Sequence, residues 1–421
     1  MLSSEWKYVP GDEFCLKVTD GTHDSPKQVD HGKPLITSKH IKGDEIDFDT
    51  AYLISEDDFN EINKRSHVDQ WDVIISMIGA YCGFCFIESN ESIDYAVKNV
   101  GLFKAGTEVN AKWLYYYLNS PIGKAHLNQV KSGSTQPYIA LGALRKLPIL
   151  TPKKSNVKDK LVKVLDAIDS KIRVNTRINS ELEAMTKTLY DYWFVQFDFP
   201  DVDGKPYKAS SGKMLYDKVL KREIPEGWQV KKLASVTSVI RRGLSPKYTD
   251  QGGIPVLNQK CIRDQKISFE DARRHQVILD DDERLLKIFD VVVNSTGVGT
   301  LGRVSYVKRL LESKTTVDSH VSIVRANSDL VPPQYLAWSL MRYQPIIEAA
   351  ANGSTGQVEL SKTFLENIDI IVPSDSVTKK FIKFVEPIVS SLAKREEENE
   401  QLVSLRNWLL PMLMNGQVTV K

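Results

Sequence analysis

The sequence predicts an α+β protein in which two similar α/β domains are separated by two long antiparallel coiled-coil helices, with pseudo-twofold (circular) symmetry. Three observations carry this prediction. Apolar residues recur with helical spacing over residues 156–194, and the same spacing returns over residues 377–412. The segments that precede these two stretches also resemble one another in order and spacing. The predicted order is therefore domain, helix, domain, helix.

Residues 156–194 form the element around which the other segments are arranged. Their apolar residues alternate between steps of three and four, and polar Asn175 fills the one missing place. This spacing is typical of a helix that lies against another long helix. At about 1.5 Å per residue, such a helix would be close to 60 Å long. The stripe consists of Leu161, Leu165, Ile168, Ile172, Ile178, Leu182, Met185, Leu189 and Tyr192.

The partner helix is expected in the same chain, over residues 377–412. Its stripe consists of Phe381, Val385, Ile388, Leu392, Leu402, Leu405, Leu409 and Met412. We interpret the two helices as a paired spacer between two domains. Two unrelated coiled-coil segments are the alternative, and an internal repeat favours the spacer.

The internal repeat joins the two segments that precede the helices. Residues 34–42 (PLITSKHIK) return 221 positions later as residues 255–263 (PVLNQKCIR). The offset elsewhere drifts only between about 218 and 222, and the order is kept, so chance does not explain the match. The further matches join residues 71–76 to 289–294, Gly79 to Gly297, residues 100–105 to 321–326, and the Gly-Ser-Thr tripeptide at 133–135 to that at 353–355.

The repeat and the two stripes together give the expected domain limits. Short β-branched runs such as residues 73–75 and 147–150 read as strands, and residues 111–118 read as a short helix. Each half is therefore expected to be α+β with mostly antiparallel strands. The limits are residues 1–152 for the first domain, 153–197 for the first spacer helix, 198–227 for a polar connector, 228–373 for the second domain, 374–415 for the second spacer helix and 416–421 for a loose tail.

Composition restricts the class of protein and its compartment. The 421 residues are 42% apolar and 26% charged, which is ordinary for a soluble protein of two or three domains. The net charge of +2 excludes a uniformly basic DNA-coating protein, so a nucleic-acid role would need Lys and Arg gathered on one face. The first ten residues lack an apolar signal core, and no run approaches the roughly 18 residues that cross a bilayer. We expect a cytoplasmic protein.

Four cysteines in so long a chain do not indicate a disulfide framework. Cys82 and Cys85 do form a CxxC spacing, but a zinc site would need a second pair of ligands at suitable spacing. Because both lie within the apolar stretch 74–87, we interpret them as small core or hairpin residues. No metal site is expected.

Residues 297–302 (GVGTLG) satisfy the GxGxxG pattern of dinucleotide-binding proteins. That motif needs a helix after its last glycine, whose N-terminus holds the pyrophosphate. The strand-like run 303–307 follows instead, and residues 79–84 of the first half lack the pattern. A hairpin turn is the better interpretation.

Two catalytic alternatives are weaker. Asp290, Glu312 and Lys314 could form the D…ExK set of a metal-dependent nuclease, in which carboxylates hold Mg²⁺. The first half keeps Asp72 but has no ExK at the corresponding place. No DPPY-like or NPPF-like tetrapeptide of adenine methyltransferases occurs. The sequence therefore predicts no catalytic centre.

Polar loops recur at the same places in both halves and carry the candidate DNA-binding residues. Lys, Arg, Ser and Thr can bind phosphate oxygens, while Asn, Gln and Arg can pair with base edges in the major groove. Two similar faces in opposite orientation would suit duplex DNA, although ordinary solvent-exposed turns remain the alternative for any single residue. The candidates are Thr22, His23, Ser25, Lys27, Ser38, Lys39, Lys42, Tyr81, Ser134, Thr135, Gln136, Arg241, Arg242, Ser245, Lys247, Tyr248, Asn258, Gln259, Lys260, Arg263, Thr296, Ser354, Thr355 and Gln357.

Over essentially its whole length, the chain resembles the specificity subunit of type I restriction–modification systems. The resemblance rests on the connector motifs, on the Gly-Ser-Thr tripeptides and on the order of domains and helices. The sequence departs from a strict repeat where Gln136-Pro137 follows the first tripeptide and Gly356-Gln357 the second. The connector motifs are residues 193–200 (WFVQFDFP), 204–208 (GKPYK), 211–212 (SG) and 224–228 (IPEGW).

The resemblance implies two target recognition domains, each reading one half of a bipartite, asymmetric site on double-stranded DNA, with the helices fixing the gap between them. It implies no catalysis and no cofactor of the chain's own. Two methyltransferase subunits using S-adenosylmethionine would dock on it and flip an adenine in each half-site. Two motor–nuclease subunits using ATP and Mg²⁺ would complete the restriction complex.

Two other classes of function remain open at the level of the sequence. One is a nuclease or methyltransferase that acts alone, which the missing catalytic motifs disfavour. The other is a protein scaffold whose repeated halves bind protein, with the long helices as a dimeriser. Salt dependence separates the scaffold from the DNA reader, because counterion release makes DNA affinity fall steeply with salt.

Overall fold

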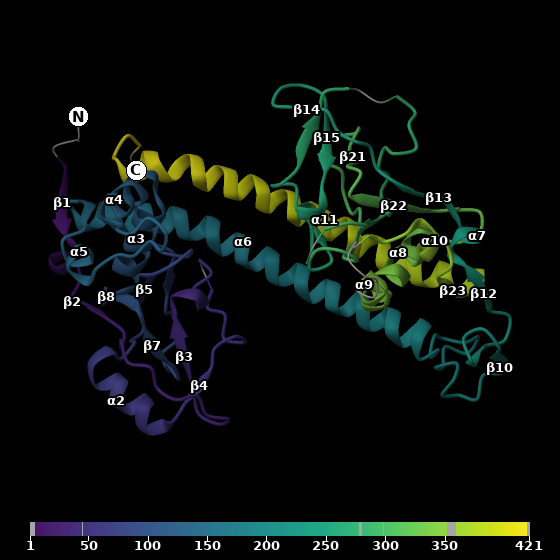
Figure 1. Cartoon of the computed structure of the whole chain (residues 1–421), viewed down its shortest axis with the longest axis horizontal. Coiled ribbons are helices and arrows are strands. Elements are labelled where there is room, and N and C mark those ends of the chain that lie inside the picture. The colour runs from purple at the N-terminus through teal and green to yellow at the C-terminus, as the bar shows by residue number, and fades with distance from the viewer. Residues whose placement is uncertain (1–4, 44, 278–279, 298, 352–358, 419–421) are drawn as a thin grey trace. The chain divides into compact units, whose positions relative to one another are not determined.

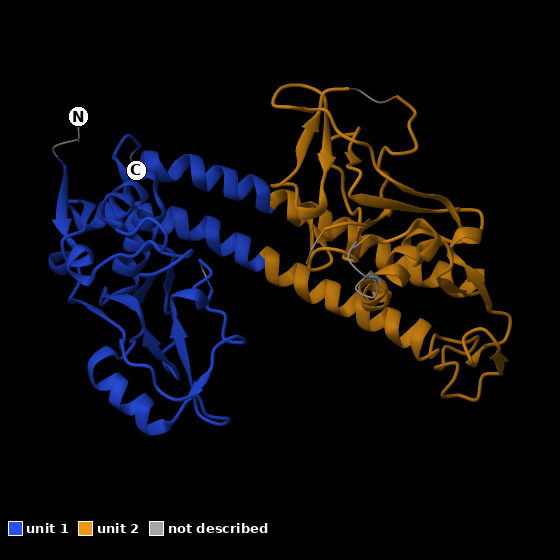
Figure 2. Ribbon diagram, viewed as in Figure 1, with its two compact units in different colours: residues 1–174, 399–421 blue, residues 175–398 orange. Residues whose placement is uncertain are grey.

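Each half of the chain is organised around a four-stranded antiparallel sheet. The computed structural model describes residues 5–43, 45–277, 280–297, 299–351 and 359–418. Residues 1–174 with 399–421 form one compact unit, and residues 175–398 form the other (Figure 2). This division cuts both long helices, so the domain limits given above stay predictions.

The first unit carries nine short strands and five short helices besides its parts of the long helices, within the described residues (Figure 1). In chain order these elements, with one 3-10 turn, are β1 (Trp6–Pro10), α1 (Gly11–Phe14), β2 (Lys17–Asp20), β3 (Lys33–Thr37), η1 (Ser38–His40), β4 (Leu53–Ile54), α2 (Glu56–Ser66), β5 (Asp72–Ser76), β6 (Cys85–Ile87), β7 (Ala96–Lys98), β8 (Val100–Lys104), α3 (Glu108–Asn119), α4 (Pro121–Val130), α5 (Leu141–Arg145) and β9 (Pro148–Pro152).

The second unit begins with a two-stranded hairpin of the connector, β10 (Met214–Asp217) and β11 (Arg222–Pro225). Its remaining elements are β12 (Gln229–Lys232), α7 (Leu233–Val236), β13 (Thr237–Arg242), β14 (Tyr248–Thr249), β15 (Ile254–Leu257), η3 (Gln259–Cys261), β16 (Ile262–Arg263), β17 (Lys266–Ile267), β18 (Arg273–His275), β19 (Val291–Asn294), β20 (Val304–Tyr306), β21 (Thr316–Val317), β22 (Val321–Ala326), α8 (Pro333–Arg342), α9 (Gln344–Ala351), α10 (Lys362–Glu366) and β23 (Asp369–Val372).

The two units share one topology, which confirms the predicted repeat. The strand order is β2-β8-β5-β6 in the first unit and β13-β22-β19-β20 in the second. Each unit also pairs one strand in parallel, β3 with β7 and β15 with β21. In each unit the strand that begins the repeated domain pairs antiparallel with the strand that ends it, β1 with β9 and β12 with β23.

A close approach of backbone occurs at the same point of both topologies. A Cβ at Gly21, directly after β2, would lie 2.5 Å from the carbonyl oxygen of Val97. A Cβ at Gly243, directly after β13, would lie 2.0 Å from that of Val317. Only glycine leaves room for the crossing chain, which explains the glycine at this place in each half.

Each central sheet is buried on both faces. In β5, Val73 and Ile75 belong to a core shared with α3 and the long helix, while Ile74 belongs to a core shared with β7. Residues 291–293 of β19 repeat this alternation. The period of two along a strand therefore sends side chains to two separate cores.

The two long helices are α6 (Ser155–Tyr190), which continues into the π-helical turn η2 (Asp191–Val195), and α11 (Asp375–Met414). Their parts pack antiparallel within each unit. In the first unit Arg406 bonds Asp169 at 2.8 Å, and Leu413 shares a core with Leu161. In the second, Tyr190 packs on Phe381 with ring centroids 6.0 Å apart. The predicted antiparallel pairing is confirmed.

Beyond Asn175 the predicted stripe of α6 is wrong at Met185 and Tyr192, while Ile178, Leu182 and Leu189 are half-buried. Met185 is 63% exposed and Tyr192 is 37% exposed, whereas Asn179 and Thr186 are buried. The error has a physical cause: the buried positions of this part of α6 carry polar side chains, so apolar residues do not mark the face. Asn179 bonds to α11, and Thr186 donates to the Leu182 carbonyl of α6 itself. Asn175 Nδ2 donates to Glu398 Oε2 at 2.8 Å. In α11 the buried residue lies one position after the predicted one at two places, Val389 and Leu410.

All four cysteines are buried and free. Burial raises the pKa of the Cys15 and Cys85 thiols to about 12 and that of Cys261 to about 11. The CxxC pair therefore packs as protonated core residues, as predicted. Among the described residues, no helix combines the length and the apolar character needed to cross a bilayer.

Candidate nucleic-acid interface

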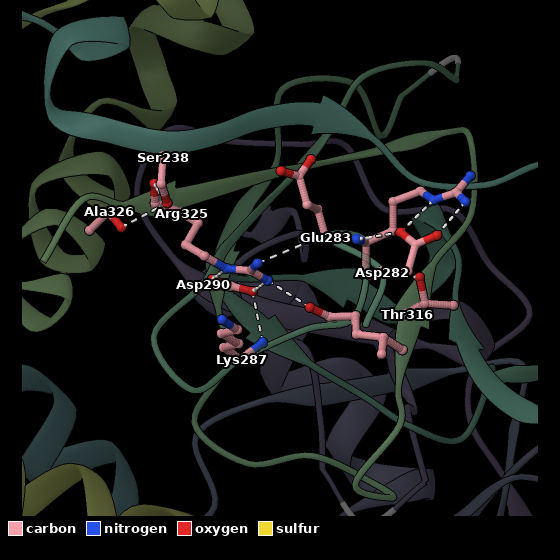
Figure 3. Close-up of polar contacts among 10 residues, drawn as sticks. Ser238, Asp282, Glu283, Lys287, Asp290, Thr316, Arg325 and Ala326 are labelled. Carbon is pink, nitrogen blue, oxygen red and sulfur yellow. Dashed lines mark hydrogen bonds and ion pairs between the residues drawn. The ribbon is translucent and has the colours of Figure 1, made fainter. Parts of the chain in front are cut away.

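A buried ion pair ties the same two strands together in each unit. Asp72, at the start of β5, is 2% exposed and accepts a hydrogen bond from Lys104 Nζ at 2.5 Å. Asp290, directly before β19, is also 2% exposed and accepts two hydrogen bonds from Arg325, at 2.8 and 2.6 Å (Figure 3). Because Lys104 ends β8 and Arg325 lies near the end of β22, the pairs fix one end of each sheet. The candidate loops leave the opposite end.

The two ion pairs differ in how well they compensate the buried carboxylate. Arg325 donates to both carboxylate oxygens of Asp290, through Nε and Nη2, and it also donates to the backbone carbonyls of Glu283 and Leu285 (Figure 3). Asp290 accepts the backbone N–H of Lys287 at 2.7 Å as well. Lys104 is shared between Asp69 and Asp72, at 2.7 and 2.5 Å. Burial raises the pKa of Asp72 to about 6, and this outweighs the lowering by the Asp69 backbone N–H and the Lys104 ammonium.

The nuclease alternative does not gain a metal site. Asp290 is held by Arg325, while Glu312 pairs with Arg274 at 2.6 Å and Lys314 pairs with Asp280. Across the described residues, no three His, Cys, Asp or Glu side chains lie close enough to hold a metal ion together. The acidic residues singled out from the sequence thus serve separate ion pairs.

The GxGxxG segment is a hairpin turn, as predicted. It joins β19 to β20, which pair antiparallel, and the N–H of Gly302 donates to the carbonyl of Asn294 at 2.8 Å. Val298 lies outside the described residues. Since a strand follows the glycines, no helix N-terminus is present there to hold a pyrophosphate.

In the first unit, contacts link the predicted loops to one another at one end of the sheet. His23 Nδ1 lies 3.0 Å from Asn99 Oδ1, and Ser38 Oγ donates to the Asn99 carbonyl at 2.7 Å. Lys42 Nζ donates to the Tyr81 hydroxyl at 3.2 Å and lies 4.2 Å from the centre of its ring. Ile78 bridges to Tyr138, which brings the loop of residues 131–138 to the same end.

In the second unit, six of the predicted residues line two recesses, while Ser245, Lys247 and Arg263 line neither. One recess of about 440 Å³ is lined by Tyr248 and residues 258–260, together with Arg273, Asp318 and His320. Arg273 lies 3.4 Å from the centre of the Tyr248 ring. Thr296 joins this group, since its Oγ1 lies 2.6 Å from His320 Nδ1.

The other recess, of about 470 Å³, is lined by Arg241 and Arg242 with Ser322, Glu359 and Lys362 among its neighbours. Arg242 forms an ion pair with Glu359, and Arg241 Nη1 lies 3.1 Å from Glu283 Oε2. The two predicted arginines are therefore already paired with carboxylates and stand apart from the first recess.

Exposure sorts the candidate residues. Thr22 and Ser38 are buried, and the Ser38 hydroxyl also accepts from the backbone N–H of Met77 at 3.1 Å. Ser354, Thr355 and Gln357 lie outside the described residues. Lys42, Tyr81, Arg242, Asn258, Gln259 and Thr296 are half-buried. The exposed candidates are His23, Ser25, Lys27, Lys39, Ser134, Thr135, Gln136, Arg241, Ser245, Lys247, Tyr248, Lys260 and Arg263.

Several residues of these clusters do not stand out in the sequence. Lys98 and Asn99 in the first unit, and Asp318 and His320 in the second, contact or line the candidate groups. They lie directly before the matched runs 100–105 and 321–326, so a fifth recurring loop was available as a signal. Arg273 follows no such pattern and is recognisable only from the structure.

The comparisons with known proteins agree with this arrangement. A family model described as the type I restriction modification DNA specificity domain matches residues 3–184 and again residues 225–403. The chain belongs to this family. One DNA specificity domain therefore falls on each half of the repeat, and the family accounts for the shared topology.

Two similar curated proteins are specificity subunits by name. The chain is 24% identical over 320 residues to the type I restriction enzyme MjaIX specificity subunit of Methanocaldococcus jannaschii, covering 74% of this chain and 70% of that one. It is 21% identical over 336 residues to the type I restriction enzyme HindI specificity subunit of Haemophilus influenzae, covering 68% and 72%.

A solved specificity subunit has the same fold. The crystal structure of the type I restriction–modification system S subunit from M. genitalium matches with a TM-score of 0.61 and 14% identity, covering 97% of this chain and 96% of that one. At this identity the likeness concerns the fold. It agrees with two specificity domains and long helices in one chain.

Proposed function

We propose that this chain is the DNA-sequence specificity subunit of a type I restriction–modification complex. Each specificity domain would read one half of a bipartite, asymmetric target on double-stranded DNA. The observation that carries the proposal is the recurrence of the same loops at the same strand ends in both units, with different residues on them. One framework with two sets of loop residues suits two different half-sites.

The exposed and half-buried loop residues are the proposed DNA contacts. Lys27, Lys39 and Lys247 suit phosphate oxygens, while Gln136, Asn258 and Gln259 suit base edges. Thr22 and Ser38 would support the loops from within, because they are buried and Ser38 bonds three backbone groups. Ser354, Thr355 and Gln357 remain part of the proposed surface.

The long helices would fix the gap between the half-sites and dock the catalytic partners. Two methyltransferase subunits would supply adenine methylation with S-adenosylmethionine, and two motor–nuclease subunits would supply cleavage with ATP and Mg²⁺. The chain itself would be non-catalytic and bind none of these cofactors. The four free thiols fit work in a reducing cytoplasm.

Genome-wide mapping of methylated adenines tests the proposal. We expect a single bipartite motif with a fixed gap when the chain is co-expressed with the methyltransferase subunit of its own system, and no motif when the chain is left out. A methylation pattern that ignores the chain would overturn the proposal. Replacing residues 228–373 with the corresponding domain of a relative should change one half-site and leave the other unchanged.

The salt dependence of binding separates this function from a protein scaffold. A DNA reader that neutralises several phosphates loses affinity steeply between about 50 and 200 mM salt, because counterions are released on binding. We expect that behaviour for the chain with its methyltransferase partner on target duplex. Binding that hardly changes with salt would favour the scaffold.

A further inference from the structure

Lys98 and Asp318 occupy the same position in the two domains. The register Thr37–Lys98 continues the parallel pairing of β3 with β7, and Asn258–Asp318 extends the equivalent pairing of β15 with β21 by one residue. Lys98 bridges in parallel to Thr22, and Asp318 bridges in parallel to Leu244. The preceding carbonyls, of Val97 and Val317, each accept the N–H of that bridge partner.

The two residues carry opposite charges at this shared position. Lys98 Nζ lies among the loops of the first unit and donates to Ser25 Oγ at 2.5 Å. An ammonium has two further donors after that bond. Lys98 is therefore suited to an acceptor such as guanine O6 or N7.

Asp318 lies in the recess of the second unit beside cationic residues. Lys260 and Arg273 line the same recess and are exposed, and the acidic Glu270 and Asp271 line it as well. Asp318 lines the recess although the residue is only 2% exposed. The Asp318 carboxylate accepts the backbone N–H of His320 at 2.9 Å through Oδ1. A carboxylate in a recess that Glu270 and Asp271 also line repels phosphate, and this favours contact with a hydrogen-bond donor on a base edge.

We propose that the two domains read opposite kinds of base edge at this position. Asp318 accepts a hydrogen bond from an exocyclic amino group, preferentially cytosine N4, and Lys98 donates to the acceptor edge of guanine. The inference rests on the proposed function and names the base chemistry that each half-site contains at one place. No bond is broken or formed in this recognition.

A purely structural role for Asp318 is the competing explanation. Its Oδ1 caps the turn between β21 and β22 by accepting the His320 N–H. Asp318→Asn keeps this acceptor and the size of the side chain while it replaces Oδ2 with a donor. The substitution therefore separates the turn cap from base recognition.

The test measures binding of the full chain, in complex with its methyltransferase subunit, to its mapped target. Each amino-bearing base of the half-site read by residues 228–373 is replaced in turn by an analogue without its amino group, 2-pyrimidinone for cytosine or purine for adenine. One replacement should weaken wild-type binding by roughly 5- to 150-fold and have little effect on the Asp318→Asn protein. Asp329→Asn, the same change at an exposed residue beyond the other end of β22, should behave as wild type.

Several outcomes of this experiment would overturn the proposal or support it. Analogue penalties that are the same in wild type and Asp318→Asn would overturn the proposal, as would a wild-type complex indifferent to every analogue in that half-site. If Asp318→Asn does not fold, Asp318→Glu takes its place. Lys98→Gln should relax a guanine requirement in the other half-site only. If methylation does not depend on the chain at all, the proposed function fails instead, so the two failures are distinguishable.

Discussion

At the scale of single residues, the buried carboxylates stabilise the sheets from which the loops leave. Asp290 is the better compensated of the two, because Arg325 donates to both of its oxygens, through Nε and Nη2. Its position directly before a β run, which in the sequence resembled part of a nuclease motif, is explained by this ion pair.

We predict that Asp290→Ala lowers the free energy of unfolding by about 3–5 kcal/mol, because it leaves Arg325 buried without its partner. Chemical denaturation followed by circular dichroism measures the change. Glu283→Ala is the matched control: Glu283 is 65% exposed, and its pair with Arg241 should contribute about 0–1 kcal/mol. Equal losses in the two variants would contradict the assignment.

The raised pKa of Asp72 predicts that its contribution to the free energy of unfolding changes with pH in the direction opposite to that of most carboxylates. Because its folded-state pKa is raised from 3.8 to about 6, the folded protein binds a proton more readily than the unfolded chain between these values. Its stabilising contribution is present below pH 3.8 and is lost as the pH rises through 6. The loss amounts to about 3 kcal/mol by pH 7.

Asp72→Asn should remove this dependence, since Asn resembles the protonated acid and does not titrate. We expect the difference in unfolding free energy between wild type and Asp72→Asn to shift in favour of the variant by about 3 kcal/mol from pH 4 to pH 7. Denaturant unfolding at a series of pH values measures it. A constant difference across that range would show that Asp72 is ionised throughout.

Single residues also set the limit of what the sequence could predict about the interface. Ser38 and Lys39 were both predicted to bind DNA because they are polar and lie in a recurring loop, but Ser38 is buried and Lys39 is exposed. Whether a loop residue turns inward depends on long-range contacts, here with Asn99 and Met77, that no local pattern encodes. The sequence analysis did not select Asp318, because an acidic residue does not indicate a DNA contact.

At the scale of elements, α6 combines an apolar start with a polar middle. Asn179 is buried, its amide Nδ2 contacts the Leu392 carbonyl at 3.4 Å, and among the described residues its Oδ1 has no hydrogen-bond partner. A polar residue at such a position reduces stability and defines the register of paired helices.

Asn179→Leu should therefore stabilise the protein. Removing a buried amide oxygen without a partner should gain about 1 kcal/mol, which raises the melting temperature of a unit of this size by roughly 2–4 °C. Differential scanning calorimetry measures the shift. Ser180→Leu, at an exposed neighbouring position, should leave the melting temperature within about 1 °C of wild type.

The order of elements was predictable, but their finer register was not. The 221-residue repeat alone equates β3 with β15 and β8 with β22, because β-branched runs and their glycines recur at fixed spacing. The face of α6 was misplaced after Asn175 because its buried side chains are Asn and Thr. The spacing of apolar residues cannot identify a helix face whose buried residues are polar.

At the scale of the whole molecule, both long helices pass from one compact unit into the other, at residues 174–175 of α6 and 398–399 of α11. Asn175 of α6 bonds Glu398 of α11, so these two residues lie opposite each other in the helix pair. This gives a defined place at which to change the length of the proposed spacer.

We predict that inserting four residues after Val174 together with four after Glu398 changes the gap in the methylated motif and leaves both half-sites unchanged. Four residues add about 6 Å and slightly more than one helical turn, and paired insertions keep the helices in register. Adenine-methylation mapping measures the gap. Conservative substitutions at Val174 and Glu400, two exposed residues beside the insertion points, serve as the control, and altered half-sites with an unchanged gap would contradict a spacer role.

In each of these two ion pairs both partners belong to one domain, and this matters when domains are exchanged between related genes. Asp72 pairs with Lys104, and Asp290 pairs with Arg325, within the same domain, so exchange of an entire domain between genes leaves these two buried pairs intact. Lys308 of the second domain instead pairs with Glu183 and Glu396 of the long helices, so an exchanged domain must keep a cation there. A crossover inside a domain could separate the two members of a pair, at a cost of several kcal/mol. Exchanges that begin and end in the long helices or the connector therefore keep each of these two pairs together.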